Sequence, residues 1–234
     1  MASEIDLHPV QSNILLVLLF KPEAKFVELN KLKVSNDHFT FHLKRLIDMG
    51  FIQKKPNSKY ILTTKGKEFS NRFDTENVTV ERQAKTAVLI VGVRKNNKGE
   101  PEYLVQQRLK QPYYGFYGFV TGKVKWGETV SLAASREFEE ETGLKAKMTL
   151  VGIKHKMDYS KKGELLEDKF FYVFRASNTK GRLVEEFEGG RNSWLAQNKI
   201  FELHDLFDGV RESIDLADSQ KLSFVETKYK VHGY

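Results

Sequence analysis

The stretch from Gly122 to Leu144 constrains the fold of this chain more than any other part of the sequence. Its apolar residues recur with helical spacing, which predicts a helix from about residue 130 to residue 142. Three glutamates of that helix, Glu137, Glu140 and Glu141, stand at positions i, i+3 and i+4. This spacing places their carboxylates within an arc of about 100° on one face of the helix.

This acidic face favours a hard divalent cation. Like charges repel unless a cation neutralises them, and oxygen ligands without sulfur or imidazole nearby select magnesium or manganese over zinc. Arg136, beside the cluster, can pair with a neighbouring carboxylate and orient it. The alternative is a solvated acidic face, which is the usual role of a glutamate-rich helix.

The wider pattern favours the metal site. Gly122 is followed after five residues by Glu128, and seven residues later by the run Arg136-Glu-Phe-Glu-Glu-Glu-Thr-Gly-Leu144. This pattern resembles the Nudix box of the Nudix hydrolase family, and the resemblance covers roughly residues 85–205. The family usually has Pro-Gly before this glycine, where Val120-Thr121 stands here.

The resemblance implies an α/β/α sandwich in which the box forms a loop, a helix and a second loop. It implies an enzyme that hydrolyses a diphosphate linkage in a nucleoside-diphosphate-linked metabolite, with Mg²⁺ or Mn²⁺ as cofactor. The three helix glutamates and Arg136, which orients one of them, are the expected catalytic residues. The metal ligands implied by the family are Glu137, Glu140, Glu141, Glu128 and the backbone at Gly122.

The general base is open between two regions. Metal ions that bridge the diphosphate oxygens neutralise the charge that builds up as water attacks one phosphorus, and a carboxylate accepts the proton of the water. Glu140 of the box is one candidate. Glu185, Glu186 and Glu188 of a later loop are others, although a surface role is commoner for each of these three.

Substrate contacts are less specific in the sequence. Arg108 and Lys123 are candidate phosphate contacts, and simple surface charge explains them equally well. Four aromatic residues are candidates for stacking on a base, although core positions are the commoner use of aromatic residues in strands. These are Tyr113, Tyr114, Phe116 and Tyr117.

The chain changes character between Phe73 and Lys85, where a polar segment separates a helix-rich part from a strand-rich part. We predict an α+β protein with domains at 1–75 and 85–234, joined by a linker at 76–84. Strands of the second domain are expected near residues 86–94, 102–108, 115–119, 148–156, 169–174 and 193–195. Further helices are expected around 203–211 and 219–225, either packed on the sandwich or forming a dimer interface.

The first domain has the element order of a winged helix. Helices are predicted at 10–20, 25–32 and 36–49, the last ending at Gly50, which suits a left-handed cap. Two strands, at 51–55 and 60–63, then flank a turn, and a helical pattern resumes at 64–73. This order resembles bacterial and archaeal winged-helix regulators.

Positive charge is concentrated on the third helix and the hairpin. Seven basic residues stand between Lys44 and Lys67 against one acidic residue, Asp48. This favours double-stranded DNA as a partner and, through two half-sites, a homodimer; protein contacts are the alternative use of the fold. His38 and His42 are interpreted as packing or phosphate contacts rather than metal ligands. The predicted DNA-binding residues are Asn36, His38, Thr40, Phe41, Lys44, Arg45 and Lys59.

The composition indicates where in the cell the protein is located, but it leaves two functions open. The chain has no cysteine, and its longest apolar run, Ile14 to Phe20, is far shorter than the roughly 20 residues of a membrane span. We expect a cytoplasmic protein without membrane contact. The first hypothesis is a hydrolase with an attached DNA-binding domain. The second is a transcription regulator whose Nudix domain senses a nucleotide-like metabolite and changes DNA affinity.

Overall fold

The computed structural model describes residues 7–74, 76, 79–80, 82–219, 221–232 and 234. The chain divides into two compact units, residues 1–82 and 83–234. Part of the segment predicted as a linker is structured, because β5 (Thr79–Val80) pairs with β4 (Phe73–Asp74) in a two-stranded hairpin. The residues between these two strands lie largely outside the described ranges.

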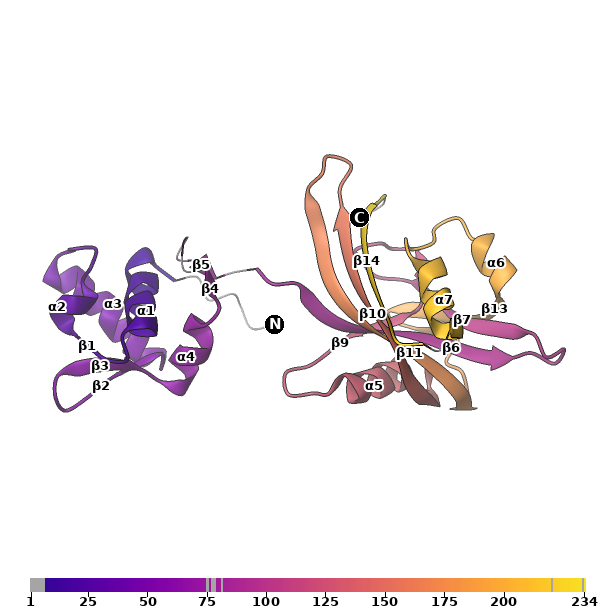
Figure 1. Cartoon of the computed structure of the whole chain (residues 1–234), viewed down its shortest axis with the longest axis horizontal. Coiled ribbons are helices and arrows are strands. Elements are labelled where there is room, and N and C mark those ends of the chain that lie inside the picture. The colour runs from indigo at the N-terminus through magenta and orange to yellow at the C-terminus, as the bar shows by residue number, and fades with distance from the viewer. Residues whose placement is uncertain (1–6, 75, 77–78, 81, 220, 233) are drawn as a thin grey trace. The chain divides into compact units, whose positions relative to one another are not determined.

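The first unit contains four helices and a three-stranded sheet of order β1-β3-β2 among its described residues (Figure 1). Its assignment as a winged helix stays a prediction. In chain order the elements are α1 (Pro9–Phe20), β1 (Ala24–Lys25), α2 (Phe26–Leu29), α3 (Asn36–Asp48), β2 (Ile52–Lys54), β3 (Lys59–Leu62) and α4 (Thr64–Ser70).

The second predicted helix was wrong in length. Lys25 belongs to β1, where it pairs with Lys59, and α2 ends at Leu29 instead of residue 32. The Asn30 side chain donates to the Val34 carbonyl at 2.8 Å and accepts from the Val34 N–H at 3.1 Å. These two bonds close a turn that stops the helix, because asparagine side chains compete with backbone helix bonds.

The second unit is built on a nine-stranded sheet. Its order is β12-β13-β7-β6-β11-β10-β14, with β8 paired to β7 and β9 paired to β6. The strands are β6 (Lys85–Lys95), β7 (Pro101–Arg108), β8 (Tyr117–Gly118), β9 (Val120–Lys123), β10 (Leu144–Tyr159), β11 (Leu165–Gly181), β12 (Glu186–Phe187), β13 (Gly190–Ala196) and β14 (Ser223–Lys230). The helices are α5 (Val130–Thr142), α6 (Gln197–Phe201) and α7 (Val210–Ser219).

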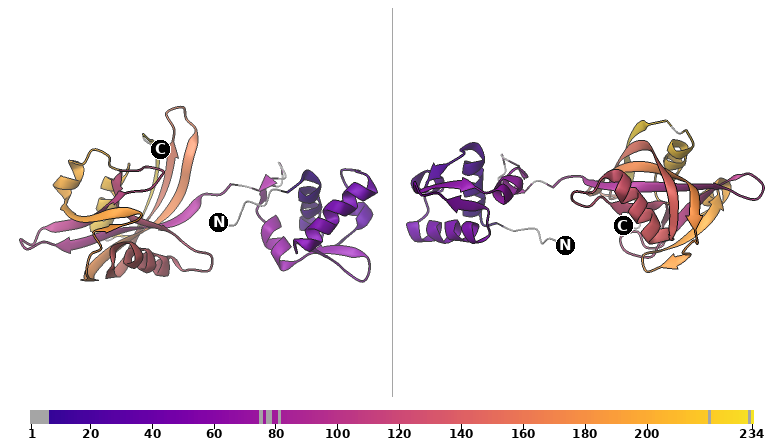
Figure 2. Two further views of the ribbon diagram at one scale, coloured as in Figure 1. Left: turned by 180° about the vertical axis from the view of Figure 1, so that it is seen from behind. Right: turned by 90° about the horizontal axis from the view of Figure 1, so that it is seen from below.

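Helices cover both faces of this sheet, as Figures 1 and 2 show. Along β6, Leu89 and Val91 pack with buried residues of α6 and α7, such as Ile214. The alternate residues Val88 and Ile90 pack with α5. Because both faces are covered, β6 is a nearly continuous apolar run rather than an alternating strand. The second unit is therefore a mixed α/β fold with helices on both faces of one sheet.

The second unit differs from the sequence prediction in three places. Helix α7 starts at Val210 rather than near residue 203, and the segment 115–119 contributes only the two-residue strand β8. The helix expected at 219–225 was wrong, because 223–230 is strand β14, parallel to β10. Val225, Thr227 and Tyr229 are less exposed than their neighbours, which is the two-residue period of a strand. The region packs on the sheet through α7.

Candidate active site

Helix α5 is anchored by its apolar side, which leaves its acidic side free. Ala133, Ala134 and Phe138 are fully buried against the sheet. Thr129 caps the start of the helix, because its hydroxyl accepts the Leu132 N–H at 3.3 Å. Gly143 caps the end with a left-handed φ of 70°, which is available to glycine with little strain. These anchors fix the direction in which the glutamates point.

One guanidinium holds three of the box carboxylates. Arg136 donates from Nε and Nη2 to the two oxygens of Glu128, at 2.7 and 2.9 Å. Its Nη1 donates to Glu137 at 2.7 Å and to Glu140 at 3.1 Å. The Arg136 bonds and the Lys125 N–H lower the pKa of Glu128 to about 2, so this carboxylate stays ionised. The pairing expected for Arg136 is present in the structure.

Glu137 lies directly against the backbone of β9. A Cβ placed on Gly122 would lie 2.0 Å from Glu137 Cγ and Cδ, far inside van der Waals contact. Only glycine leaves room for this side chain. The missing Cβ at Gly122 therefore lets the backbone form one wall of the acidic cradle, which is the cluster of Glu128, Glu137, Glu140 and Glu141. Gly122 itself is fixed by the pairing of β9 with β6, where it lies opposite Val88.

Glu141 is the most buried carboxylate of the box helix face, with a side chain 13% exposed. Burial raises its pKa, and the negative charge of Glu137 adds to this effect. Gln106 Nε2 donates to it at 3.0 Å, and Lys110 Nζ lies 4.0 Å from its other oxygen. The carboxylates of Glu137 and Glu141 thus lie close together in a partly desolvated site, and a bound cation would relieve their repulsion.

The residues present fit a hard divalent metal ion. Glu128, Glu137, Glu140 and Glu141 supply oxygen donors, and Arg136 with the more distant Lys110 offsets only part of their charge. Oxygen-rich donor sets of this kind suit Mg²⁺ or Mn²⁺.

Glu137 and Glu141 line a cavity of about 680 Å³. Its other walls are strongly basic: eight basic side chains line it against five acidic ones, so the cavity suits an anionic ligand beyond the acidic cluster. The basic lining residues are Lys85, Arg108, Lys110, Lys123, Lys125, Lys154, Lys156 and Lys169.

Lysines of β10 and β11 form a wall of the cavity that sequence reasoning missed. Lys154 is 1% exposed, donates to the Gly209 carbonyl at 2.7 Å, and has its pKa lowered to about 8 by burial. Lys156 pairs with the buried Asp158 at 2.7 Å. Lys154, Lys156 and Asp158 stand two residues apart along one strand, so their side chains share a face. This two-residue spacing of charged residues is the sequence feature from which the wall could have been predicted.

The two predicted phosphate contacts both line the cavity. Arg108 is partly occupied, because its Nε and Nη2 donate to the carbonyls of Pro112 and Gln111 at 2.6 and 3.1 Å. Lys123 keeps its side chain available, while its carbonyl accepts from Arg136 at 3.2 Å. Among the four aromatic candidates, Tyr113 lines the cavity, where it is 4% exposed.

The candidate bases are placed differently from one another. Glu140 is held by Arg136, with a side chain 56% exposed. The described residues that line the cavity do not include Glu185, Glu186 or Glu188. Glu186 pairs with Arg191 at 2.9 Å on the surface.

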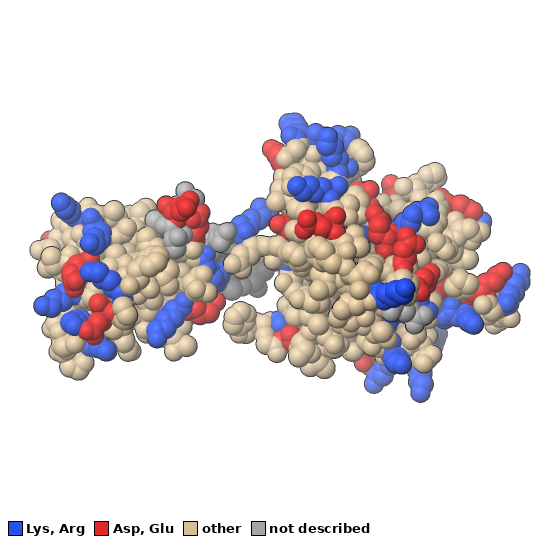
Figure 3. All heavy atoms as spheres, viewed as in Figure 1, with Lys and Arg blue, Asp and Glu red and all other residues tan. Residues whose placement is uncertain are grey.

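The first unit places six of the seven predicted DNA-binding side chains on the exposed side of α3. The seventh, Lys59, lies on β3 and forms an ion pair with Glu23. Lys55 also approaches Glu23, at 3.6 Å. On the face drawn in Figure 3, basic and acidic side chains alternate over this unit. Part of the positive charge predicted for the hairpin is therefore neutralised.

Comparison with known proteins identifies the second unit. The NUDIX domain profile matches residues 84–218, more than half of the chain. The chain belongs to the Nudix family. The match covers α5 with its glutamates, the cavity walls from β6 to β11 and helix α7, so the Nudix hydrolase domain coincides with the site described above.

Solved Nudix structures share the fold at low sequence identity. The MutT protein of Bacillus halodurans superposes with a TM-score of 0.51 at 19% identity, over 64% of this chain and 93% of that one. The NUDIX domain of Shewanella oneidensis NrtR, solved with ADP ribose, gives a TM-score of 0.52 at 13% identity, over 68% and 99%.

A curated relative, an octanoyltransferase of Myxococcus xanthus, is 28% identical over 151 residues. That alignment takes in 64% of this chain but 41% of the relative. Within the described ranges, the chain has no helix with the length and apolar character of a membrane span.

Proposed function

We propose that this protein is a Mg²⁺- or Mn²⁺-dependent hydrolase that cleaves a diphosphate linkage in a nucleoside-diphosphate-linked metabolite in the cytoplasm. The observation that carries the proposal is the acidic cluster around Arg136, which opens through Glu137 and Glu141 into a basic cavity. An acidic metal cradle beside a basic anion pocket matches a diphosphate, whose oxygens bind metal and whose remaining charge needs cations.

The residues of the cradle have distinct roles in this proposal. Glu128, Glu137, Glu140, Glu141 and the backbone at Gly122 would hold the metal, which supplies charge neutralisation at the diphosphate oxygens. Arg136 donates to three of these carboxylates and so orients them. Glu141 lines the cavity, so this ligand faces the substrate, and Glu140 stays the candidate base within the box.

The cavity walls select the substrate class. Lys123 and Lys125, next to the cradle, are proposed to contact the diphosphate itself, together with Arg108. Lys154 and Lys156 of β10 extend the positive lining and suit a further anionic or hydroxyl-rich group of the substrate. The likeness of the fold to a NUDIX domain solved with ADP ribose supports a nucleoside diphosphate joined to a sugar as the class.

A second proposed function rests on the first unit. We place a winged-helix domain at 1–75 and the Nudix domain with its carboxyl-terminal helix and strand at 85–234, and α3 presents exposed residues that suit the major groove of DNA in a homodimer. In that case the Nudix domain would sense its ligand and change DNA affinity by linkage, with or without hydrolysis.

The test is incubation of the purified chain with Mg²⁺ and a panel of nucleoside-diphosphate-linked compounds, with products separated by ion-exchange chromatography. The hydrolase proposal expects two phosphate monoesters from one class of compound, loss of turnover in EDTA, and recovery on adding Mg²⁺. No turnover on any compound, with a rise in the thermal unfolding midpoint for one of them, would leave a sensor instead.

A further inference from the structure

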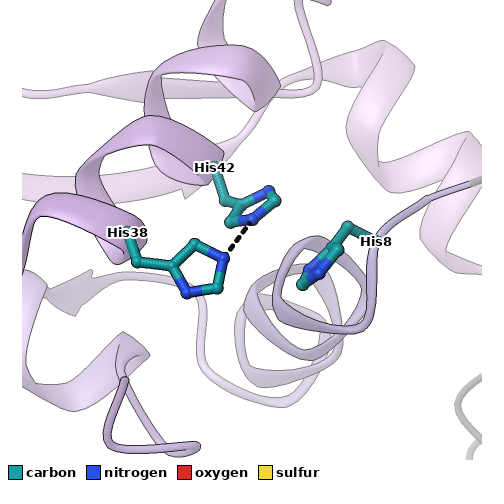
Figure 4. Close-up of side chains that lie close together, drawn as sticks. All are labelled: His8, His38 and His42. Carbon is teal, nitrogen blue, oxygen red and sulfur yellow. Dashed lines mark hydrogen bonds between the residues drawn. The ribbon is translucent and has the colours of Figure 1, made fainter. Parts of the chain in front are cut away.

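Three histidines meet in the first unit, far along the chain from the glutamate cradle. His38 and His42 stand one turn apart on α3, and His8 immediately precedes α1. One ring nitrogen from each of the three lies within 4.8 Å of the others. Figure 4 shows the rings of His38 and His42 side by side and the ring of His8 facing them from the start of α1.

We propose that His8, His38 and His42 form a binding site for a transition-metal ion of the Zn²⁺ type. The Nε2 atoms of His38 and His42 are 2.9 Å apart. With metal–nitrogen bonds of about 2.0–2.1 Å, that separation corresponds to a ligand–metal–ligand angle of about 90°, and a small rotation of either ring opens it to the tetrahedral value. An i, i+4 pair on a helix thus supplies two ligands at nearly the required spacing.

His42 supplies the second observation. Its side chain is 6% exposed, and its Nδ1 has no hydrogen-bond partner among the described residues. The nitrogen of this buried ring that has a partner is Nε2, the atom that faces His38.

His8 completes the set and couples it to helix α1. Its ring stacks on His42 with centroids 4.1 Å apart, and its Nδ1 accepts the Val10 N–H at 3.3 Å. To ligate the ion, the His8 ring must turn out of this stack, because its nitrogen lone pairs lie in the ring plane. It also gives up the long bond to Val10, because a metal-bound neutral ring has no acceptor nitrogen left. Gln11 Oε1 still accepts the His8 N–H at 3.0 Å, so the start of α1 stays capped. The metal would thereby join the start of α1 to α3.

Ligand chemistry separates this site from the glutamate cradle. Imidazole nitrogens suit Zn²⁺, Ni²⁺ and Cu²⁺, whereas carboxylates suit Mg²⁺ and Mn²⁺. Two of the three histidines, His8 and His38, are exposed, so an ion reaches the cluster from solvent. Three protein ligands leave a fourth position for water or for a group from a partner.

The test is calorimetric titration of the metal-stripped full chain with Zn²⁺ in excess Mg²⁺, which keeps the carboxylate site filled. We expect the wild type to bind a single Zn²⁺ per chain. His38→Gln and His8→Asn should each bind it at least about tenfold more weakly, because losing even a group that hydrogen-bonds to a metal ligand weakens binding by about that factor. Asparagine at position 8 keeps a side-chain cap for α1. His204→Gln, an exposed histidine of the second unit, is the matched control and should bind as wild type does.

Two further readouts decide the result. Long-range proton–nitrogen spectra should show ring-nitrogen shifts of His8, His38 and His42 on adding Zn²⁺, with His204 unchanged. The thermal unfolding midpoint of the wild type should rise with Zn²⁺ and that of His38→Gln should not. Zn²⁺ binding of equal affinity in wild type and both cluster variants, or the lack of stoichiometric binding in Mg²⁺, would overturn the proposal.

Discussion

Replacing Gly122 with alanine should displace Glu137 and disable the cradle. The new Cβ would lie 2.0 Å from Glu137 Cγ and Cδ, whereas carbon atoms in contact stay about 3.5–4.0 Å apart. The Glu137 side chain must therefore swing away and lose its 2.7 Å bond to Arg136. Overpacking of this kind costs about 1–3 kcal/mol, and a catalytic group misplaced by about 1 Å costs about a hundredfold in rate.

The assay is urea unfolding followed by tryptophan fluorescence. The two tryptophans, Trp126 and Trp194, both belong to the second unit, so the signal follows that unit alone. The matched background is Glu137→Ala, which removes the clashing atoms, and there Gly122→Ala should cost close to nothing. An equal loss of stability in both backgrounds would show that the new methyl group does not clash with Glu137.

Three further predictions follow from individual contacts. Arg136→Lys should lower kcat by about ten- to hundredfold in turnover assays, because lysine cannot make the two-point contact with Glu128, and an unchanged kcat would contradict that role. Burial lowers the pKa of Lys154 to about 8 from 10.5, so between these two pH values the unfolded chain binds more protons than the folded one. The free energy of unfolding should therefore rise with pH in that interval. Chemical denaturation should show that Lys154→Met removes this rise. Lys44→Ala should weaken DNA binding in fluorescence anisotropy and reduce the salt dependence by about one unit of slope, and equal salt slopes would argue against a phosphate contact.

Much of the cradle could be predicted from the sequence because its signals are local. The spacing of Glu137, Glu140 and Glu141 along one helix fixes their common face whatever surrounds it. The Arg136 pairing follows from the same helix geometry. The strand β6 was equally readable, since an apolar run from residue 87 onward has few alternatives to a buried strand.

The cavity walls were not predictable in the same way, because they depend on long-range pairing. Lys154 lines the cavity because β10 pairs with β11 and β14, and no local pattern announces the parallel pairing with β14. The three-histidine cluster was missed for a similar reason. His38 and His42 are visible as an i, i+4 pair, but His8 joins them only through the packing of α1 on α3.

The most direct test of the acidic face of α5 as the catalytic centre compares Glu141→Gln with Glu139→Gln in Mg²⁺-dependent hydrolysis of the best compound from the panel. Both residues belong to α5, but Glu141 faces the cavity whereas Glu139 is half exposed and pairs with Lys145 at 3.3 Å. We expect turnover to fall by at least about a hundredfold in Glu141→Gln and to stay at the wild-type level in Glu139→Gln. Equal turnover by the two variants, at any level, would contradict the assignment of the acidic face as the catalytic centre.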